Sequence, residues 1–166
     1  CLAVDENGNE IDGDKIMAII SNYLRNKGKL AKDTLVATVM SNLGLHKYAR
    51  DNGLELAQTQ VGDRYVLEEM LKQSGHVILL DYNPTGDGIL TSLMLIQAIL
   101  EANKTASQMA EIIKLYPQVL VNAKVNADKK YDYNKDTEIQ EAIEKLEKEF
   151  AGNGRVLIRP SGTEPL

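Results

Sequence analysis

Short apolar segments alternate with segments of helical periodicity over roughly the first two thirds of the chain, and this alternation restricts the fold more than any other feature. Strands are expected at 2–4, 35–39, 54–59 and 76–80. Helices are expected from 16 towards a stop at Gly28, at 43–52, at 65–72 and at 89–102, the last capped by Asp87. Strands separated by helices of this length favour an α/β fold with a mostly parallel sheet, helices on both faces, and functional loops at the carboxyl ends of the strands.

A different pattern begins near Pro117. A linking helix is expected at 106–116, then strands at 118–125 and 154–158, separated by a polar loop at 131–135 and a helix with one apolar face. That face carries Ile139, Ile143, Leu146 and Phe150. Strand, helix and strand make only about fifty residues, which is small for an independent core. We therefore expect an α/β domain at 1–116 and a partial α+β domain at 117–166, whose remaining elements would follow Leu166.

The composition excludes several classes of protein. With 43% hydrophobic residues the chain can bury a core, and 19 basic against 24 acidic residues give a net charge of −5. That balance disfavours a broad grip on nucleic acid or an anionic membrane. One cysteine cannot form an internal disulfide, and no apolar run approaches the roughly 20 residues that cross a bilayer. A cytoplasmic location is expected, although a targeting peptide before Cys1 stays open.

The end of the chain has the chemistry of a phosphate cradle. Arg159 offers a planar fork of donors, while Ser161, Thr163 and the backbone at Gly162 add hydroxyl and amide donors. The apolar residues before Arg159 predict that the cradle follows a strand. The alternative is an ordinary turn bounded by proline, with an exposed arginine.

Four sequence segments resemble motifs of one enzyme family. The segment at 159–165 reads R-P-S-G-T-E-P and resembles the phosphate-binding loop of the α-D-phosphohexomutases. The segment at 59–66, T-Q-V-G-D-R-Y-V, resembles a loop of that family's third domain, and Q-S-G-H at 73–76 resembles the end of its sugar-recognition loop. The segment at 38–45 is typical of the glucosamine-specific bacterial branch. The resemblance extends over nearly the whole chain and preserves the family's motif order.

The resemblance implies roles for these residues. It implies that the sugar is bound by Gln73, Ser74, Gly75 and His76, and a phosphate by Arg159, Ser161, Gly162 and Thr163. Without it, a structural role for His76 is the favoured interpretation. Gly62, Asp63 and Arg64 are expected in an active-site loop. Whether Arg64 approaches a phosphate or Asp63 the reacting hydroxyl is left open.

The family's catalytic groups have no counterpart here. The chain starts at Cys1, within an expected strand, whereas the family's aspartate-rich magnesium loop precedes that strand and a phosphate-carrying serine lies in an earlier domain. We therefore expect a C-terminal fragment that is inactive alone, with no catalytic residue and no metal ligand of its own. Its implied partners are the missing N-terminal domains and a small sugar phosphate, and a homodimer is compatible with the resemblance.

The junction of Lys72 and Gln73 departs from the family pattern. There the family has a strand entry and Gly-Gly-Glu before the glutamine, and the glutamate contacts sugar hydroxyls. Either this chain carries a deletion or the sequence omits residues of a mobile loop. We favour omission, because substrate loops often lose order without ligand.

The implied reaction is reversible phosphoryl transfer. It interconverts glucosamine 6-phosphate and glucosamine 1-phosphate through the 1,6-bisphosphate, requires Mg²⁺, and supplies UDP-N-acetylglucosamine and cell-wall synthesis. The small C-terminal domain is expected to close on the substrate by a hinge near 115–118. Two alternatives remain: a phosphomannomutase or phosphoglucomutase of the same superfamily, and a non-catalytic module that binds sugar phosphates.

Other candidate sites are weak. The acidic turn beginning at Asp5 has Glu10 and Ile16 where a calcium loop needs glycine and a carboxylate. A turn with a helix cap explains residues 85–88 as well as phosphate binding does. His46 is expected on a helix without a partner, and Cys1 has no catalytic role.

Overall fold

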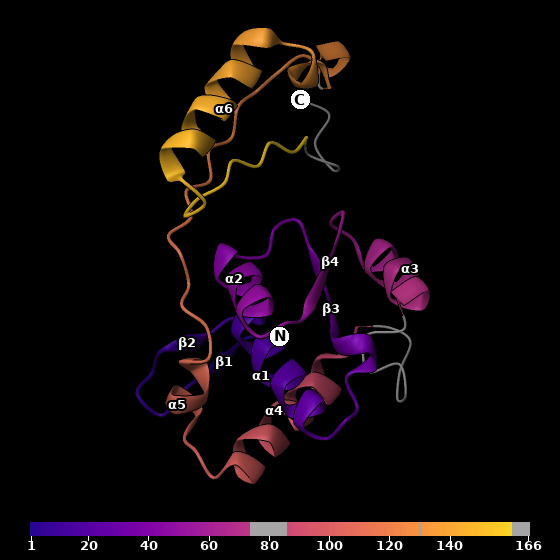
Figure 1. Cartoon of the computed structure of the whole chain (residues 1–166), viewed down its shortest axis with the longest axis vertical. Helices are drawn as coiled ribbons and strands as arrows, with labels where there is room; N and C mark the ends of the chain where they lie inside the picture. The colour runs from indigo at the N-terminus through magenta and orange to yellow at the C-terminus, as the bar shows by residue number, and fades with distance from the viewer. Residues whose placement is uncertain (74–85, 130, 161–166) are drawn as a thin grey trace. The chain divides into compact units, whose positions relative to one another are not determined.

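The computed structural model describes residues 1–73, 86–129 and 131–160 (Figure 1). The chain divides into two compact units, Cys1–Tyr116 and Pro117–Leu166. The strand expected at 76–80 and the residues from Ser161 onward lie outside the described ranges.

A parallel strand pair forms the centre of the first unit. β3 (Thr34–Thr38) pairs with β4 (Glu55–Thr59) in the register Thr34↔Glu55 to Thr38↔Thr59. Leu35, Val36 and Ala37 are all buried, which explains the continuous apolar run. The crossover helix α2 (Leu43–Asp51) packs on β4, and α3 (Asp63–Gln73) packs on both strands. Figure 1 shows α2 and α3 on either side of the pair, so the expected α/β architecture is confirmed.

Two long helices pack together beside this pair. α1 (Gly13–Asn26) buries Ile16, Ile19 and Ile20, and it contacts α4 (Gly88–Ala102), which buries Leu95 and Ala98. The Asp12 carboxylate accepts a hydrogen bond from Lys15 N at 2.9 Å and begins α1. Asp87 accepts from Leu90 N at 2.9 Å, which confirms the expected cap of α4.

A small hairpin precedes α1. β1 (Ala3–Val4) pairs antiparallel with β2 (Glu10–Ile11), a strand that the sequence analysis missed. Asp5 Oδ1 accepts from Asn7 N at 2.9 Å and from Asn9 N at 2.8 Å. The carboxylate therefore holds the turn together by local hydrogen bonds.

The helix expected at 106–116 is shorter than predicted. α5 (Ala106–Ala110) begins with a capping box between Thr105 and Gln108, and the chain is irregular beyond it. Tyr116 N donates to Asn42 Oδ1 at 2.9 Å, so at this end the backbone bonds to a distant side chain instead of continuing a helical ladder. Tertiary hydrogen bonding thus overrides the helical pattern.

The second unit contains one long helix. α6 (Thr137–Phe150) begins at Asp136, whose Oδ1 accepts from Glu138 N and Ile139 N. Two short 3₁₀ turns precede it, η2 (Ala127–Lys129) and η3 (Asp132–Asn134), the latter within the expected polar loop. A third 3₁₀-type element, η1 (Ala31–Asp33), precedes β3 in the first unit.

The strands expected at 118–125 and 154–158 are wrong. Both segments are irregular over their length. Val119, Leu120 and Val121 are 89%, 78% and 81% exposed, so neither a partner strand nor a core covers them within the described part of the chain. A strand needs a hydrogen-bonded neighbour, and apolar β-branched composition alone does not supply one.

Candidate functional site

The carboxyl ends of β3 and β4 bring two of the sequence motifs together. Thr38 and Thr59 are register partners, and Val39 N donates to Thr59 O at 2.9 Å beyond the last pair. The loop at 39–42 and the loop at 60–62 both leave from this edge. Segments that are about twenty residues apart in sequence therefore start side by side, where functional loops of parallel sheets gather.

Gly62 shapes the start of α3. Its φ is +140°, and an added Cβ would lie 3.3 Å from the Tyr65 ring. The Gly62 carbonyl accepts from Tyr65 N at 3.0 Å and from Val66 N at 3.2 Å. The conformation and the close approach both favour glycine at this position, and the expected place of Gly62 in an active-site loop stays a prediction.

Arg64 is exposed on the first turn of α3. Its Nε donates to Glu68 Oε1 at 2.8 Å, and 84% of its side chain is accessible. The hydrogen bond that Arg64 donates to Glu68, aided by the charge of that carboxylate, raises the pKa of Arg64 above the ordinary value. This solvent-exposed pair is weak, so an incoming anion can compete for the guanidinium. Asp63 opens α3, and its side chain lies outside the description.

The predicted sugar-binding residues cannot be compared with the structure. Gln73 is the last residue of α3, and its side chain is not described. Ser74, Gly75 and His76 lie outside the described ranges. Their sugar-binding role stays a prediction.

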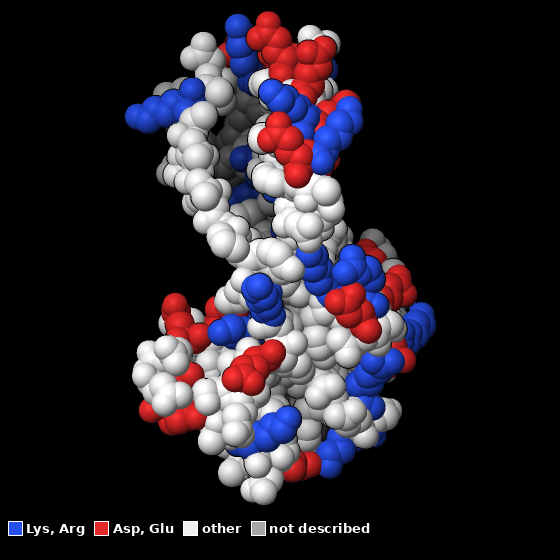
Figure 2. Space-filling view, turned by 60° about the vertical axis from the view of Figure 1, so that its left-hand side comes forward, with Lys and Arg blue, Asp and Glu red and all other residues white. Residues whose placement is uncertain are grey.

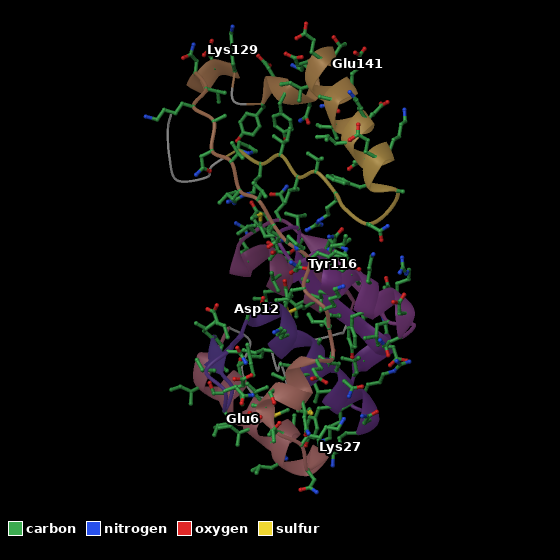
Figure 3. The ribbon with its side chains drawn as sticks, turned by 90° about the vertical axis from the view of Figure 1, so that its left-hand side faces the viewer. Glu6, Asp12, Lys27, Tyr116, Lys129 and Glu141 are labelled. Carbon is green, nitrogen blue, oxygen red and sulfur yellow. The ribbon has the colours of Figure 1, made fainter. Side chains whose placement is uncertain are left out.

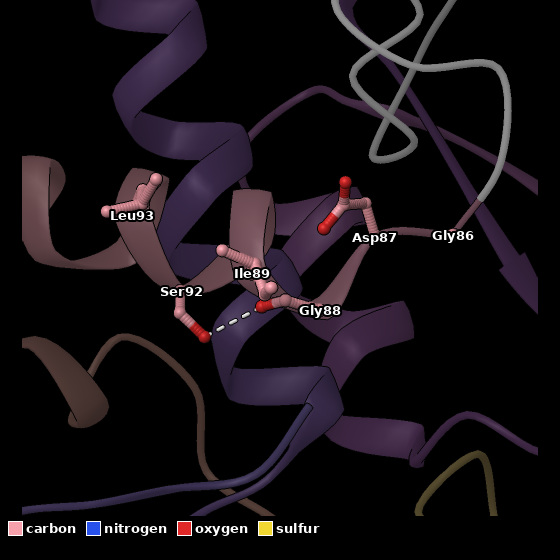
Figure 4. A pocket seen from close by; sticks show the side chains of 6 residues that line it. All are labelled: Gly86, Asp87, Gly88, Ile89, Ser92 and Leu93. Atoms are coloured by element: carbon pink, nitrogen blue, oxygen red, sulfur yellow. Dashed lines mark hydrogen bonds between the residues drawn. The ribbon is translucent and has the colours of Figure 1, made fainter.

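A pocket at the start of α4 was a weaker candidate for phosphate binding. Figure 4 shows its lining by Gly86, Asp87, Gly88, Ile89, Ser92 and Leu93. Ser92 Oγ donates to Gly88 O at 2.7 Å, and Thr91 Oγ1 donates to Asp87 O at 2.7 Å. The Asp87 carboxylate, which caps the helix, would also repel an anion. These contacts favour the turn and cap over a phosphate site.

Arg159 is exposed in the second unit and makes no hydrogen bond or ion pair with any residue that the structure describes. Its predicted companions Ser161, Gly162 and Thr163 lie outside the described ranges. On α6, the i,i+4 pair of Lys148 Nζ and Glu144 Oε2 lies at 3.7 Å. The helix carries glutamates as well as lysines, so it presents no uniformly basic surface (Figure 2).

A polar cluster near the loop at 39–42 escaped the sequence analysis. Asn42 N donates to Asp14 Oδ2 at 2.6 Å. Burial raises the pKa of Asp14, and hydrogen bonds from Asn42 and Ser41 oppose that shift. His46 Nε2 lies 3.1 Å from Gln58 Nε2, so the expectation that His46 has no partner is wrong. An asparagine before a helical segment is a cap signal, but its long-range partners leave no sequence signal.

The described residues do not fit a magnesium site. No three or more of their His, Cys, Asp and Glu side chains cluster to hold a metal ion. The aspartates nearest the N-terminus have other tasks, because Asp5 holds a turn, Asp12 caps α1 and Asp14 binds Asn42. We assign no metal ligand here.

The sequence matches two family models in succession. Residues 12–116 match "Phosphoglucomutase/phosphomannomutase, alpha/beta/alpha domain III". Residues 120–166 match the C-terminal domain, domain IV, of the same enzymes.

Curated relatives are similar over the whole chain. The phosphoglucosamine mutase of Ruminiclostridium cellulolyticum is 56% identical over 173 residues, covering 99% of this chain and 38% of the relative. That of Clostridium botulinum (strain Eklund 17B) is 57% identical over 174 residues, covering 100% and 39%. The chain thus spans 38–39% of these relatives' length. Both alignments exceed the 166 residues of this chain, so the relatives contain positions without a counterpart here.

Solved structures share the fold at low identity. The N-acetylphosphoglucosamine mutase of Aspergillus fumigatus superimposes with a TM-score of 0.75 at 18% identity, covering 99% of this chain and 40% of that one. The same enzyme in complex with GlcNAc-6P and magnesium gives a TM-score of 0.72 at 20% identity, covering 99% and 41%.

Proposed function

We propose, from the premise that this chain belongs to the phosphoglucomutase/phosphomannomutase family, that it provides sugar and phosphate recognition in a phosphoglucosamine mutase. The observation that carries the proposal is the identity of 56–57% to phosphoglucosamine mutases over practically the whole chain. The motifs at 59–66, 73–76 and 159–165 support it, because each supplies polar or glycine residues suited to a sugar phosphate.

The proposed reaction is an isomerisation by two phosphoryl transfers. A phosphoserine in a preceding domain gives its phosphoryl group to O1 of glucosamine 6-phosphate, and the 1,6-bisphosphate then reorients. The serine takes back the phosphoryl group from O6, which leaves glucosamine 1-phosphate and restores the phosphoserine. Mg²⁺, bound outside the described residues, would neutralise charge on the transferred group.

This chain's residues would position the substrate. Arg159, Ser161, Gly162 and Thr163 would hold the non-reacting phosphate, and the residues from Gln73 to His76 would hold the sugar. The loop from Gly62 to Arg64 would approach from the edge of the β3–β4 pair. Positioning and charge neutralisation account for most of the catalysis of phosphoryl transfer, so residues that hold the substrate contribute to catalysis without touching the reacting atoms.

The two units would have separate tasks. We assign sugar recognition to an α/β domain at 1–116 and phosphate recognition to a domain at 117–166. A cytoplasmic location agrees with the chemistry of a soluble sugar phosphate. The described residues contain no helix long and apolar enough to cross a membrane. A homodimer stays a prediction.

The family name keeps a second substrate class open, since the matching models describe phosphoglucomutases and phosphomannomutases. The relative turnover of glucosamine 6-phosphate and mannose 6-phosphate decides between them. The assay needs a longer protein that contains this sequence and the domains that precede it in the relatives. Dominant mannose turnover would contradict the glucosamine assignment.

Comparison of the 166-residue chain with the longer protein separates both mutases from a non-catalytic module. We expect it to bind glucosamine 6-phosphate without converting it, measured by calorimetry and by a coupled assay for glucosamine 1-phosphate. If the longer protein also binds without turnover, the non-catalytic module becomes the better description.

A further inference from the structure

Asn42 connects two segments that are far apart in sequence. Asn42 is buried, with 5% of the residue accessible, between the start of α2 and the last residue of the first unit. The Oδ1 atom accepts from Gly44 N at 2.8 Å and from Tyr116 N at 2.9 Å. The Nδ2 atom donates to Tyr116 O at 2.8 Å. One amide therefore caps a helix and pairs with both backbone groups of Tyr116.

Neighbouring side chains contact both Asn42 and Tyr116. Asn42 N donates to Asp14 Oδ2 at 2.6 Å, which fixes the asparagine to the start of α1. Lys47 Nζ lies 2.9 Å from Tyr116 Oη and 4.5 Å from the centroid of its ring. Tyr116, which is labelled in Figure 3, is thus held through its backbone by Asn42 and through its side chain by Lys47.

The first unit and its regular packing end at Tyr116. Pro117 begins the second unit, and residues 117–126 are irregular and exposed. Both backbone groups of Tyr116 are hydrogen-bonded to Asn42, whereas Pro117 has no N–H to donate. These hydrogen bonds therefore restrain the backbone up to Tyr116 and no further.

We propose that Asn42 is a positioning residue that fixes where the chain leaves the first unit, so that any hinge between the two units begins after Tyr116. The inference narrows the hinge expected at 115–118 to its C-terminal side. Its catalytic consequence rests on the proposed function, because the second unit carries Arg159. A fixed exit point would limit the positions from which Arg159 meets the substrate phosphate.

We call the hydrogen bonds between the Asn42 side chain and the Tyr116 backbone the clamp. Two substitutions of Asn42 distinguish the clamp from the cap of α2. In Asn42→Ser the hydroxyl can still cap α2 at Gly44 but is too short to reach Tyr116. In Asn42→Ala both functions are lost. The matched control is Asp12→Ala, which removes the cap of α1 in the same unit without touching Tyr116.

Amide hydrogen exchange of the 166-residue chain tests the clamp directly. We expect Asn42→Ser to speed exchange of the residue 116 amide about tenfold while the amides of α2 stay protected. Asp12→Ala should speed exchange in α1 without selecting residue 116. Unchanged exchange at residue 116 in Asn42→Ser, or the same local effect in Asp12→Ala, would overturn the clamp.

The longer protein tests the positioning role. There we expect Asn42→Ser to raise KM for glucosamine 6-phosphate several-fold while kcat changes by less than about twofold, since the reacting groups are untouched. An unchanged KM would overturn the positioning role. Absence of turnover in the unsubstituted protein would instead overturn the proposed function, and the exchange result would still stand because it needs no turnover.

Discussion

Two exposed arginines in the candidate recognition motifs have different surroundings. Arg64 is paired with Glu68 at 2.8 Å, whereas Arg159 has no hydrogen-bonding partner among the residues described. An anion that binds Arg64 must compete with the Glu68 carboxylate, whereas no carboxylate among the described residues pairs with Arg159. The two side chains should therefore respond differently to substitution, although both were assigned to recognition from sequence alone.

Arg159→Ala should weaken binding of glucosamine 6-phosphate by about 1.5–3 kcal/mol, because charge-assisted hydrogen bonds to the phosphate would be lost. Titration calorimetry on the 166-residue chain measures the change. Arg50→Ala is the matched control, since Arg50 is exposed and paired with Asp51 at 3.0 Å on the surface. Equal affinities in Arg159→Ala and the unsubstituted chain would return Arg159 to the role of a surface residue in a turn.

Arg64→Ala and Glu68→Ala should each leave the free energy of unfolding almost unchanged, because an exposed i,i+4 pair contributes little to stability. Their effects on phosphate binding should differ. We expect weaker binding in Arg64→Ala alone, because Glu68→Ala leaves the guanidinium in place and removes a competing carboxylate. Equal loss of binding in both variants would indicate that the pair acts only by holding α3 together.

Among the secondary-structure elements, α2 depends on a close backbone approach. Gly44 lies on its first turn, and an added Cβ would fall inside the contact distance of the Lys114 carbonyl oxygen. The segment before Tyr116 therefore packs directly on the start of α2. This contact brings together residues that are distant in the sequence.

Gly44→Ala should lower the free energy of unfolding by about 1–3 kcal/mol, because the methyl group forces the two backbones apart. Urea unfolding followed by circular dichroism measures the loss. Gly13→Ala at the start of α1 is the control: nothing lies within 4 Å of its added Cβ, and we expect little change or a gain of a few tenths. Similar destabilisation in both variants would mean that helix-start glycines matter here for another reason.

At the scale of the whole α/β unit, two carboxylates join elements that are distant in sequence. Glu6 accepts from Ser107 Oγ at 2.5 Å and from Ser107 N at 3.2 Å, which ties the β1–β2 turn to α5. Glu101 on α4 pairs with Lys27 Nζ at 2.5 Å and accepts from Tyr23 Oη at 2.9 Å, which ties α4 to α1. The hydrogen bond from Ser107 lowers the pKa of Glu6 to about 2, and the hydrogen bond from Lys27 lowers the pKa of Glu101 to about 2.

The unit should lose stability in acid. Because the folded-state pKa values of Glu6 and Glu101 lie below the ordinary value of 4.5, their contribution is present above pH 4.5 and is lost as pH falls towards about 2. The pH dependence that Asp14 contributes has the opposite sign. Because its pKa is raised in the folded state, its contribution to stability declines as pH rises through that folded-state pKa. Urea unfolding between pH 2 and pH 6, an interval that includes these pKa values, measures how steeply the free energy of unfolding changes with pH.

Glu101→Gln should flatten that slope, because the amide cannot titrate. Glu111→Gln, on the exposed surface after α5, is the control and should leave the slope unchanged. If Glu101→Gln keeps the full acid dependence, other carboxylates are responsible for it.

Local patterns in the sequence were sufficient for most of the α/β unit. Periodicity and capping side chains predicted α1 to α4 and the pair of parallel strands, because helix geometry and caps depend on residues a few positions apart. The recognition motifs could also be identified from the sequence, because each is a short run of consecutive residues such as the one at 159–165.

Contacts between distant residues were decided only by the tertiary structure. The hydrogen bond between Asn42 and Tyr116 joins residues 74 positions apart, and the hydrogen bond between Glu6 and Ser107 joins the β1–β2 turn to α5 across 101 positions. The strands expected at 118–125 and 154–158 are wrong for the same reason. A strand takes its hydrogen bonds from another segment, so its own composition cannot guarantee that the partner is present.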